Sequence, residues 1–380
     1  MKKNNIIISF LILLLLFSLN VSAEVENIKL GAIFNLTGAM ASLEVPAKNG
    51  AVLAVKEINA KGGILGKQIK MYIEDGKTDV AAVSNATEKL LAQKVDVLFG
   101  LCDTNYVLAA GGIAQNNKIP FVDVGGTMPT IPDLTGDYVF MGCIGDNTEA
   151  KVIAKFAYDF LNARTAWTFK DTGVQCAVTI IGFFKEFFEK LGGQVILEDT
   201  LQYGDVDFRA QITRLKQLDP PPDILVVSVN ADANGIVVKQ IREMGVDIPI
   251  LSFDGFDSPL LVEVARELAD NVYFSTFVSF GSDDPIVQNF IEAYKKEYNR
   301  DCESAFAAAG YDAVYLIADA IERAGSVEGN AVRIALGETK NLPGVTGTLS
   351  YEEGSRIAIK PVTIMEVMKG KVSYLKTVMP

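Results

Sequence analysis

Hydrophobic and polar positions follow two patterns along the chain. Short, nearly continuous apolar runs predict buried strands, and longer amphipathic segments between them predict helices. The expected strands lie at residues 28–34, 68–74, 95–100, 119–126, 138–141, 165–169, 194–201, 223–229 and 248–254. The expected helices include residues 103–114, 148–161, 207–218, 232–244, 285–298 and 304–323, and residues 361–372 predict a closing, hairpin-like strand. Apolar strands that alternate with amphipathic helices predict parallel sheets covered on both faces, so we expect an α/β fold of two doubly wound lobes.

The first residues carry an export pattern. Two lysines precede an apolar run over residues 6–19, and residues 21–23 are the small residues that a signal peptidase recognises. We therefore interpret residues 1–23 as a signal peptide and expect a periplasmic mature chain that begins near Glu24. A transmembrane anchor is the alternative, but the run is shorter than the roughly 20 apolar residues that a spanning helix needs. No cysteine follows the run, which disfavours a lipid anchor at this site.

Chain length and charge narrow the function further. About 357 residues remain after the signal, which is more than one core usually supports, so two lobes are expected. The net charge of −12 falls to about −14 without the two signal lysines, with 33 basic against 47 acidic residues. No basic cluster is present to meet phosphates, so we expect no nucleic-acid partner.

The absence of histidine excludes much catalytic chemistry. None of the 380 residues is histidine, so histidine bases, Ser-His-Asp and Cys-His machinery and histidine metal sites are excluded. No loop carries a GxGxxG, a P-loop or a GxSxG. Asp103 and Asp254 could form a glycosidase-like carboxylate pair, but they lie on different predicted lobes. We therefore expect a protein that is not an enzyme and has no cofactor.

The four cysteines do not form a metal or redox motif. Cys102, Cys143, Cys176 and Cys302 are too widely spaced for a CxxC pair. In an oxidising compartment they could form one or two disulfides. Burial as small apolar thiols is at least as good an interpretation of each.

The opening unit resembles a known family. Residues 28–74 contain IKLGAIF, NLTGAM, NGAVLAVKEIN, KGGILGK and QIKMYIE, which is the order strand, loop, helix, glycine turn and strand. This TG…NG…EINAKGGILG pattern, with AGYDAV at residues 309–314, is similar to the leucine/isoleucine/valine-binding family of type I periplasmic solute-binding proteins. The resemblance extends over roughly residues 28–372. It implies an extracytoplasmic substrate-binding component of an ABC importer, whose partners are the membrane permease and ATPase.

The resemblance also implies the position of a binding site. In this family, N–H groups and hydroxyls at the start of one helix and in the next loop hold an amino-acid carboxylate. The matching positions are Asp103, Thr104, Gly125, Gly126 and Thr127, where a helix N-terminus and close backbone approach suit an anion. The amine-holding acid, a second carboxylate, a pocket tyrosine and two apolar walls match Asp254, Asp146, Asn230, Leu43 and Phe306, respectively.

Three departures make the expected pocket more acidic and less aromatic than a branched-chain amino-acid site. Asp103 replaces a small hydroxyl residue and would place a like charge beside a ligand carboxylate. The pocket aromatic of the family is absent from residues 171–175, or lies nearby after an insertion, and Asn230 replaces the second tyrosine. Sequence therefore does not name the ligand: an amino acid or related polar metabolite is expected, with an amide, amine or aromatic acid as alternatives.

Several of these residues have an ordinary structural use. Asp103 could be a helix N-cap, and Thr127 could satisfy the backbone of a glycine turn. Asp254 could be a solvated loop acid, and Phe306 lies on a helix where core packing is the default.

Family topology implies three crossings between the lobes, near Gly145, Ser275 and Thr348. The N-terminal lobe is then predicted to comprise residues 24–145 and 276–347, and the C-terminal lobe residues 146–275 and 348–380.

Besides a transport component, two other function classes remain open. One is an enzyme, although this sequence lacks the catalytic loops, and the other is a ligand-sensing receptor that uses the same fold. No DNA-binding headpiece or later spanning helix supports a repressor or a membrane receptor.

Overall fold

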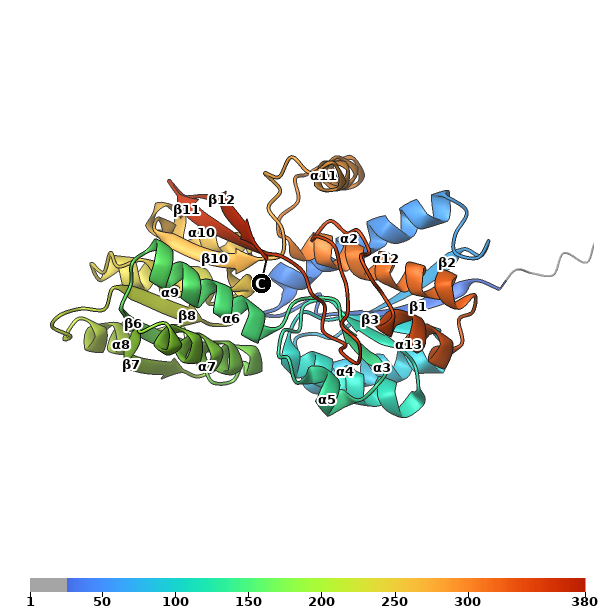
Figure 1. The fold of residues 1–380 in the computed structure, drawn as a ribbon, viewed down its shortest axis with the longest axis horizontal. Coiled ribbons are helices and arrows are strands. Elements are labelled where there is room, and N and C mark those ends of the chain that lie inside the picture. The colour runs from blue at the N-terminus through green and yellow to red at the C-terminus, as the bar shows by residue number, and fades with distance from the viewer. Residues whose placement is uncertain (1–25, 380) are drawn as a thin grey trace, which may run out of the picture.

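The computed structural model describes residues 26–379, so the predicted signal peptide and its cleavage site lie outside the described residues. Two sheets form the frame of two lobes, which lie side by side along the long axis of the molecule (Figure 1). We call the lobe built on the first sheet the N-terminal lobe and the other the C-terminal lobe.

The N-terminal lobe is built on a five-stranded parallel sheet with the order β2-β1-β3-β4-β5. Its strands are β1 (Ile28–Phe34), β2 (Ile69–Asp75), β3 (Val97–Gly100), β4 (Phe121–Asp123) and β5 (Val139–Met141). Its helices are α2 (Ala41–Ala60), α3 (Val80–Ala92), α4 (Thr104–Asn117) and α5 (Ile131–Thr135), joined later in the chain by α11 (Pro285–Tyr298), α12 (Phe306–Ala324) and α13 (Gly329–Gly337). Strands β3, β4 and β5 are buried throughout, because helices cover both faces.

The C-terminal lobe is built on a seven-stranded sheet with the order β12-β11-β10-β9-β8-β6-β7. The parallel strands are β6 (Thr165–Asp171), β7 (Gln194–Leu201), β8 (Ile224–Ser228), β9 (Ile250–Ser252) and β10 (Val272–Thr276), and the antiparallel edge consists of β11 (Val362–Met368) and β12 (Lys371–Val378). Its α-helices are α6 (Asp146–Lys155), α7 (Gln175–Lys190), α8 (Arg209–Leu215), α9 (Asn234–Glu243) and α10 (Pro259–Ala265). It also contains the short π-helix η1 (Phe156–Phe160) and the 3₁₀-helices η2 (Asp254–Phe256) and η3 (Arg266–Ala269).

Two glycines allow helices α2 and α12 to pack closely against each other. Helices α2 and α12 pack so closely that a Cβ on Gly50 would lie 1.7 Å from Ala307 O. A Cβ on Gly310 would lie 2.0 Å from Ala47 O. The NG and AGYDAV segments therefore hold two glycines that let segments far apart in sequence form one helix pair.

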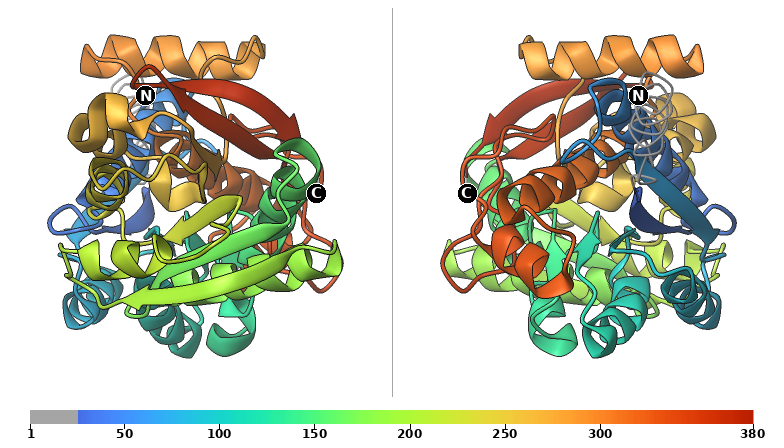
Figure 2. Two further views of the ribbon diagram at one scale, coloured as in Figure 1. Left: turned by 90° about the vertical axis from the view of Figure 1, so that its left-hand side faces the viewer. Right: turned by 90° about the vertical axis from the view of Figure 1, so that its right-hand side faces the viewer.

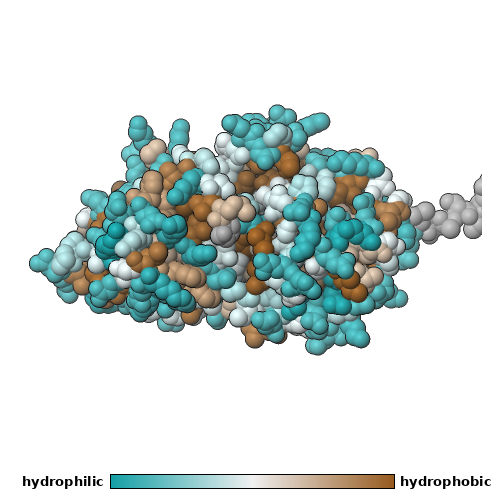
Figure 3. All heavy atoms as spheres, in the orientation of Figure 1, coloured by the Kyte–Doolittle hydropathy of each residue, from teal (hydrophilic) through white to brown (hydrophobic). Residues whose placement is uncertain are grey.

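The chain passes between the sheets after β5, after β10 and after α13, and the three passages lie close together in the middle of the molecule (Figure 1). Helix α11 follows the second passage and lies across one end of the molecule in both side views (Figure 2). The hydroxyl of Tyr298 on this helix donates to Asn49 O at 2.7 Å, which ties α11 to α2. Hydrophobic residues are visible where the lobes meet (Figure 3).

The predicted two-lobed, doubly wound fold is confirmed, although several element bounds shift. The strand expected at residues 119–126 ends at Asp123, because residues 124–127 turn back and bond to the preceding loop and to Asp123. Among residues 26–379, no helix has the length and apolar character needed to cross a membrane. Within the same residues the four cysteines are free thiols, with Cys102 and Cys143 buried.

Candidate functional site

The carboxyl ends of the parallel strands in the two lobes face each other across an interlobe cleft. A small cavity of about 30 Å³ lies at its centre. Its lining comes from both lobes: Met40, Leu43, Cys102, Asp103, Gly125, Thr127, Val174, Cys176, Val229, Asn230, Ala231, Asp254, Gly255 and Phe306. The predicted residues Leu43, Asp103, Gly125, Thr127, Asn230, Asp254 and Phe306 are therefore brought together, whereas Thr104 and Gly126 are not in this lining.

Two further spaces continue the central cavity. One of about 250 Å³ lies towards Tyr106 and Tyr203 and shares Asp103 and Asn230 with it. The other, of about 30 Å³, shares Thr127 and Asp254 with it and adds Asp146. The lobes touch across the cleft, where Asn105 Nδ2 donates to Gly173 O at 3.1 Å. This hydrogen bond links the two lobes directly beside the cavity.

Asp254 lies at the end of β9, in the 3₁₀-helix η2. One of its carboxylate oxygens, Oδ1, accepts the N–H of Gly255 at 3.0 Å, and its own N–H donates to Glu149 Oε1 at 3.1 Å. Burial, and then the charge of Asp146, raises the pKa of Asp254 to about 8. Asp254 is partly exposed and lines the cleft, so its role as a ligand contact stays a prediction.

Asp146 and Glu149 lie one turn apart at the start of α6. Both side chains are buried, and within residues 26–379 Asp146 Oδ1 and Glu149 Oε2 have no hydrogen-bond partner. Asp146 Oδ2 accepts the hydroxyl proton of Thr179. Burial raises the pKa of Asp146 to about 7, and burial together with the charge of Asp254 raises the pKa of Glu149. Unpartnered buried acids of this kind favour a cationic or hydrogen-bond-donating group nearby.

Asp103 both caps a helix and lines the cleft. Its backbone is extended, with φ −140° and ψ 139°, and Oδ1 accepts the N–H of Asn105 at 2.9 Å, which is an N-cap of α4. Its Oδ2 lies 3.8 Å from the Cys176 thiol of the opposite lobe. Burial raises the pKa of Asp103 to about 6.

Two of the expected donors in the glycine turn after β4 are already engaged. The N–H groups of Gly125 and Gly126 both donate to Asp123 Oδ1, at 3.0 and 2.7 Å. A Cβ on Gly125 would lie 2.7 Å from Cε1 of Phe306, so glycine is needed here to make room for that ring. These two N–H groups are thus engaged inside the N-terminal lobe.

Threonine side chains flank the same turn. Thr104 Oγ1 accepts the N–H of Met128 at 3.4 Å, a contact within the lobe. Thr127 lines two of the cleft spaces, and its carbonyl accepts the N–H of Asp146 at 2.7 Å, across the first passage between the lobes.

The walls of the central cavity are largely apolar. Leu43 and Phe306 come from α2 and α12, and Phe306 also packs edge-on against Phe277 with ring centroids 5.1 Å apart. Phe306 therefore belongs to the core and to the cavity wall at once. Asn230 fixes its own loop, because Oδ1 accepts the N–H of Ala231 at 2.8 Å.

Sequence reasoning missed several members of the site. Val174 lies within the loop at residues 171–175, where the expected aromatic is absent, and Cys176 directly follows this loop; both line the cavity. Glu149 was also missed, although its position three residues after Asp146 on a helix places both on one face.

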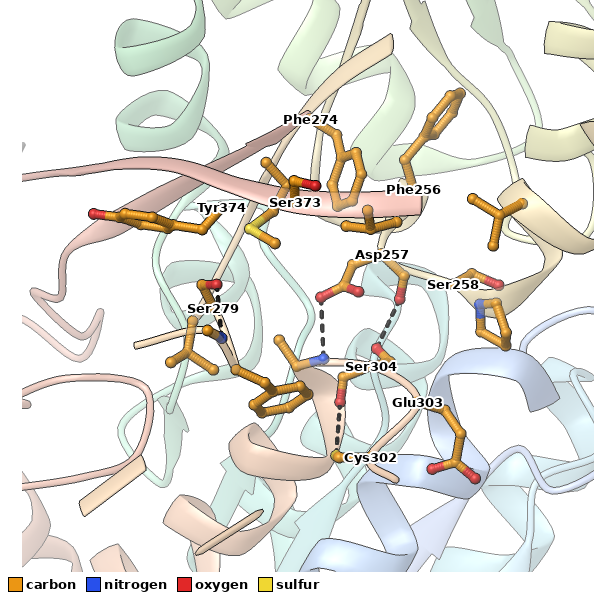
Figure 4. A pocket seen from close by; sticks show the side chains of 18 residues that line it. Phe256, Asp257, Ser258, Phe274, Ser279, Cys302, Glu303, Ser304, Ser373 and Tyr374 are labelled. Carbon is orange, nitrogen blue, oxygen red and sulfur yellow. Dashed lines mark hydrogen bonds between the residues drawn. The ribbon is translucent and has the colours of Figure 1, made fainter. Parts of the chain in front are cut away.

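A larger pocket of about 550 Å³ lies near the crossings of the chain (Figure 4). The two acids that line it, Asp257 and Glu303, are already paired. Asp257 Oδ2 accepts the N–H of Ala305 at 3.0 Å, Ser304 Oγ donates to Asp257 O at 2.7 Å, and Glu303 Oε1 lies 2.8 Å from Arg300 Nε. Because this pocket offers no free charge, the interlobe cleft is the better candidate for a polar solute.

A two-lobed α/β fold with a cleft that acids line from both lobes is consistent with a solute-binding protein. The chain matches the periplasmic binding protein family over residues 27–371 and belongs to that family. The family comprises non-catalytic solute-binding proteins, so the chain is a binding protein and not an enzyme.

Individual relatives agree with this assignment. The Leu/Ile/Val-binding protein homolog 3 of Brucella melitensis is 26% identical over 356 residues, 93% of this chain and 95% of that protein. The substrate-binding protein LivJ of a branched-chain amino acid transporter from Streptococcus pneumoniae, solved with isoleucine, is 32% identical, with a TM-score of 0.87 over 93% of this chain and 100% of LivJ. The leucine-binding protein LivK of Thermotoga maritima is 28% identical, with a TM-score of 0.86 over 93% and 99% of the two chains.

Proposed function

We propose that this chain is the extracytoplasmic substrate-binding component of an ABC importer and captures a small polar metabolite with an amino group, an amino acid or a related compound, between its lobes. The observation that carries the proposal is the set of acids that line the cleft, Asp103, Asp146 and Asp254, with the buried Asp146 Oδ1 lacking a hydrogen-bond partner among residues 26–379. A cationic amine would pair with these acids and offset their mutual repulsion.

The relatives support an amino-group ligand and a transport role. LivJ was solved with isoleucine, and the curated relatives are named for leucine, isoleucine and valine. Asp254 is the acid that we expect to meet the amine, with Asp146 and Thr127 beside it and Leu43 and Phe306 as apolar walls.

Cellular location and partners follow from the same role. The predicted signal at residues 1–23 would deliver the mature chain to the periplasm, where it would pass its ligand to a membrane permease that a cytoplasmic ATPase drives. N-terminal sequencing of the exported protein is expected to start at or near Glu24. An intact apolar run embedded in the membrane would contradict export as a soluble protein.

The ligand can be tested with the mature protein, residues 24–380. A thermal-shift screen over amino acids, amines, amides and aromatic acids should show stabilisation by an amino-group compound, followed by calorimetry. A ligand at a hundred times its dissociation constant adds about 2.7 kcal/mol to the free energy of unfolding. If only compounds without an amino group stabilise the protein, or no compound does, the proposal is wrong.

A further inference from the structure

We propose that the cleft selects an alkylammonium cation that carries no carboxylate, with Asp103 occupying the anion position at the N-terminus of α4. The inference rests on the proposed function and narrows its ligand class. It follows from which groups in the cleft are already paired and which are not.

The first step is the start of α4. An N-terminus of a helix attracts an anion through its free N–H groups and its dipole. Here the carboxylate of Asp103 fills that position, because Oδ1 accepts the N–H of Asn105 at 2.9 Å and Oδ2 lies 3.8 Å from the Cys176 thiol. A ligand carboxylate at this position would meet a buried like charge.

The second step is the turn after β4, the other place where backbone donors approach the cleft. Gly125 and Gly126 both donate to Asp123 Oδ1. A ligand carboxylate would have to displace the buried Asp123 carboxylate from its own partners. The two glycine N–H groups are therefore not free for a ligand carboxylate, and Thr127 is the other residue of this turn that lines the cavity.

The third step is the charge of the whole lining. Among the described residues that line the three connected spaces, the ionic side chains are Asp103, Asp146 and Asp254, and no lysine or arginine accompanies them. Asp146 is fully buried and its Oδ1 has no partner. A zwitterion would bring one charge that this lining favours and one that it opposes, whereas an amine brings only the favoured charge.

The fourth step is the apolar wall. Leu43, Val174, Val229 and Phe306 line the same central cavity as Asp103 and Asp254. An aliphatic chain on the ammonium group would pack against these side chains. The structure therefore fits a short alkylamine or alkyldiamine better than a strongly hydrated cation.

The raised pKa values of these acids predict a second property of binding, the release of protons. Burial raises the pKa of Asp103 to about 6 and that of Asp254 to about 8, so part of this cluster is protonated near pH 7 when no cation is present. A bound ammonium group favours the ionised carboxylates, so binding should release protons. Calorimetry in buffers of different ionisation enthalpy measures this release.

The test compares ligands that differ only in the carboxylate: isoleucine with 2-methylbutylamine, leucine with 3-methylbutylamine, and lysine with 1,5-diaminopentane. We expect at least one amine to bind the mature protein at least tenfold more tightly than its amino acid, with proton release at pH 7. Tighter or equal binding of the amino acid in every pair would overturn the inference and leave the proposed function standing. If no member of any pair binds and no other amino-group compound does, the proposed function fails as well.

Variants of Asp103 test the cause of the preference. Asp103→Ser and Asp103→Asn remove the charge, and both introduce a residue that caps helices well. Both should shift the preference towards the amino acid by tenfold or more. Asp284→Ser is the matched control, because Asp284 caps α11 in the same way, accepting the N–H of Ile286 at 2.8 Å, and does not line the cleft. A shift of equal size in the control, or no shift in either Asp103 variant, would show that Asp103 does not set the preference.

Discussion

At the scale of single residues, several side chains support the fold and also line the cleft. Asp103 is an N-cap and a cleft acid, and Phe306 is a core residue and a cavity wall. Sequence reasoning treated these uses as alternatives, but a small cleft closed between two packed lobes requires its wall residues to be part of the cores behind them. The amine-binding role of Asp254 stays a prediction.

Asp254 allows a direct test at this scale. Asp254→Asn keeps the shape of the side chain and removes its charge. If the ligand carries an amine, loss of a charge-assisted hydrogen bond in a closed cleft should weaken binding by about 1.5–3 kcal/mol, roughly tenfold or more. Calorimetry with the best amine from the screen measures the change. Unchanged affinity would remove Asp254 from the site.

At the scale of elements, the apolar pattern located most strands and helices. Strand β7 and helix α11 have the predicted bounds, and the helix expected at residues 148–161 divides into α6 and the π-helix η1. Lobe bounds remain predictions. The third crossing was predicted near Thr348, but Tyr351 OH donates to Met141 O at 3.0 Å and Met141 N–H donates to Arg356 O at 2.8 Å. These contacts favour a boundary nearer Pro361, because they attach residues 351–356 to the N-terminal lobe.

The contact between α2 and α12 gives a stability prediction. Gly50→Ala would place a methyl group 1.7 Å from Ala307 O, so the helices must separate. We expect a loss of about 1–3 kcal/mol or more in the free energy of unfolding, measured by chemical denaturation. Gly182→Ala on α7 is the control, because no atom lies within 4 Å of the new methyl group, and it should be neutral or stabilising by about 0.5–1 kcal/mol. A neutral Gly50→Ala would mean that the pair packs less closely.

At the scale of the whole molecule, the buried acids connect pH to lobe closure. Burial raises the pKa of Asp103 to about 6, of Asp146 to about 7 and of Asp254 to about 8 in the closed conformation, and raises that of Glu149. Parting of the lobes would let water reach these side chains and return their pKa values towards about 4. The closed conformation therefore holds more protons between about pH 4 and pH 8.

The sign of the pH effect follows from this difference in bound protons. Without ligand, proton binding to these acids stabilises the closed conformation relative to the open one. This stabilisation is complete below about pH 4 and is lost as the pH rises towards 8. Small-angle scattering should show a larger radius of gyration at pH 8 than at pH 5 without ligand. A saturating cationic ligand should reduce the radius at pH 8, because it binds the closed state. A radius that does not respond to pH would show that these acids do not oppose closure.

The double variant Asp146→Asn/Asp254→Asn provides the control for this measurement. Removal of two of the ionisable groups should flatten the dependence of the radius on pH. A wild-type-like dependence in the double variant would assign the effect to groups other than Asp146 and Asp254.

The sequence by itself determined the alternation of strands and helices, the two-lobed α/β class and the family, because period and turn residues are local properties of the chain. It also placed Asp103, Thr127 and Asp254 in loops at the carboxyl ends of strands, where parallel sheets bind ligands. Only the tertiary structure decided how those loops use their groups. Whether the N–H groups of Gly125 and Gly126 point at Asp123 or into the cleft depends on side-chain and backbone directions that packing sets. The acidic cluster likewise exists only because α6 and η2 meet in the folded chain, where Asp254 N–H donates to Glu149 Oε1 at 3.1 Å although the two residues are more than a hundred positions apart.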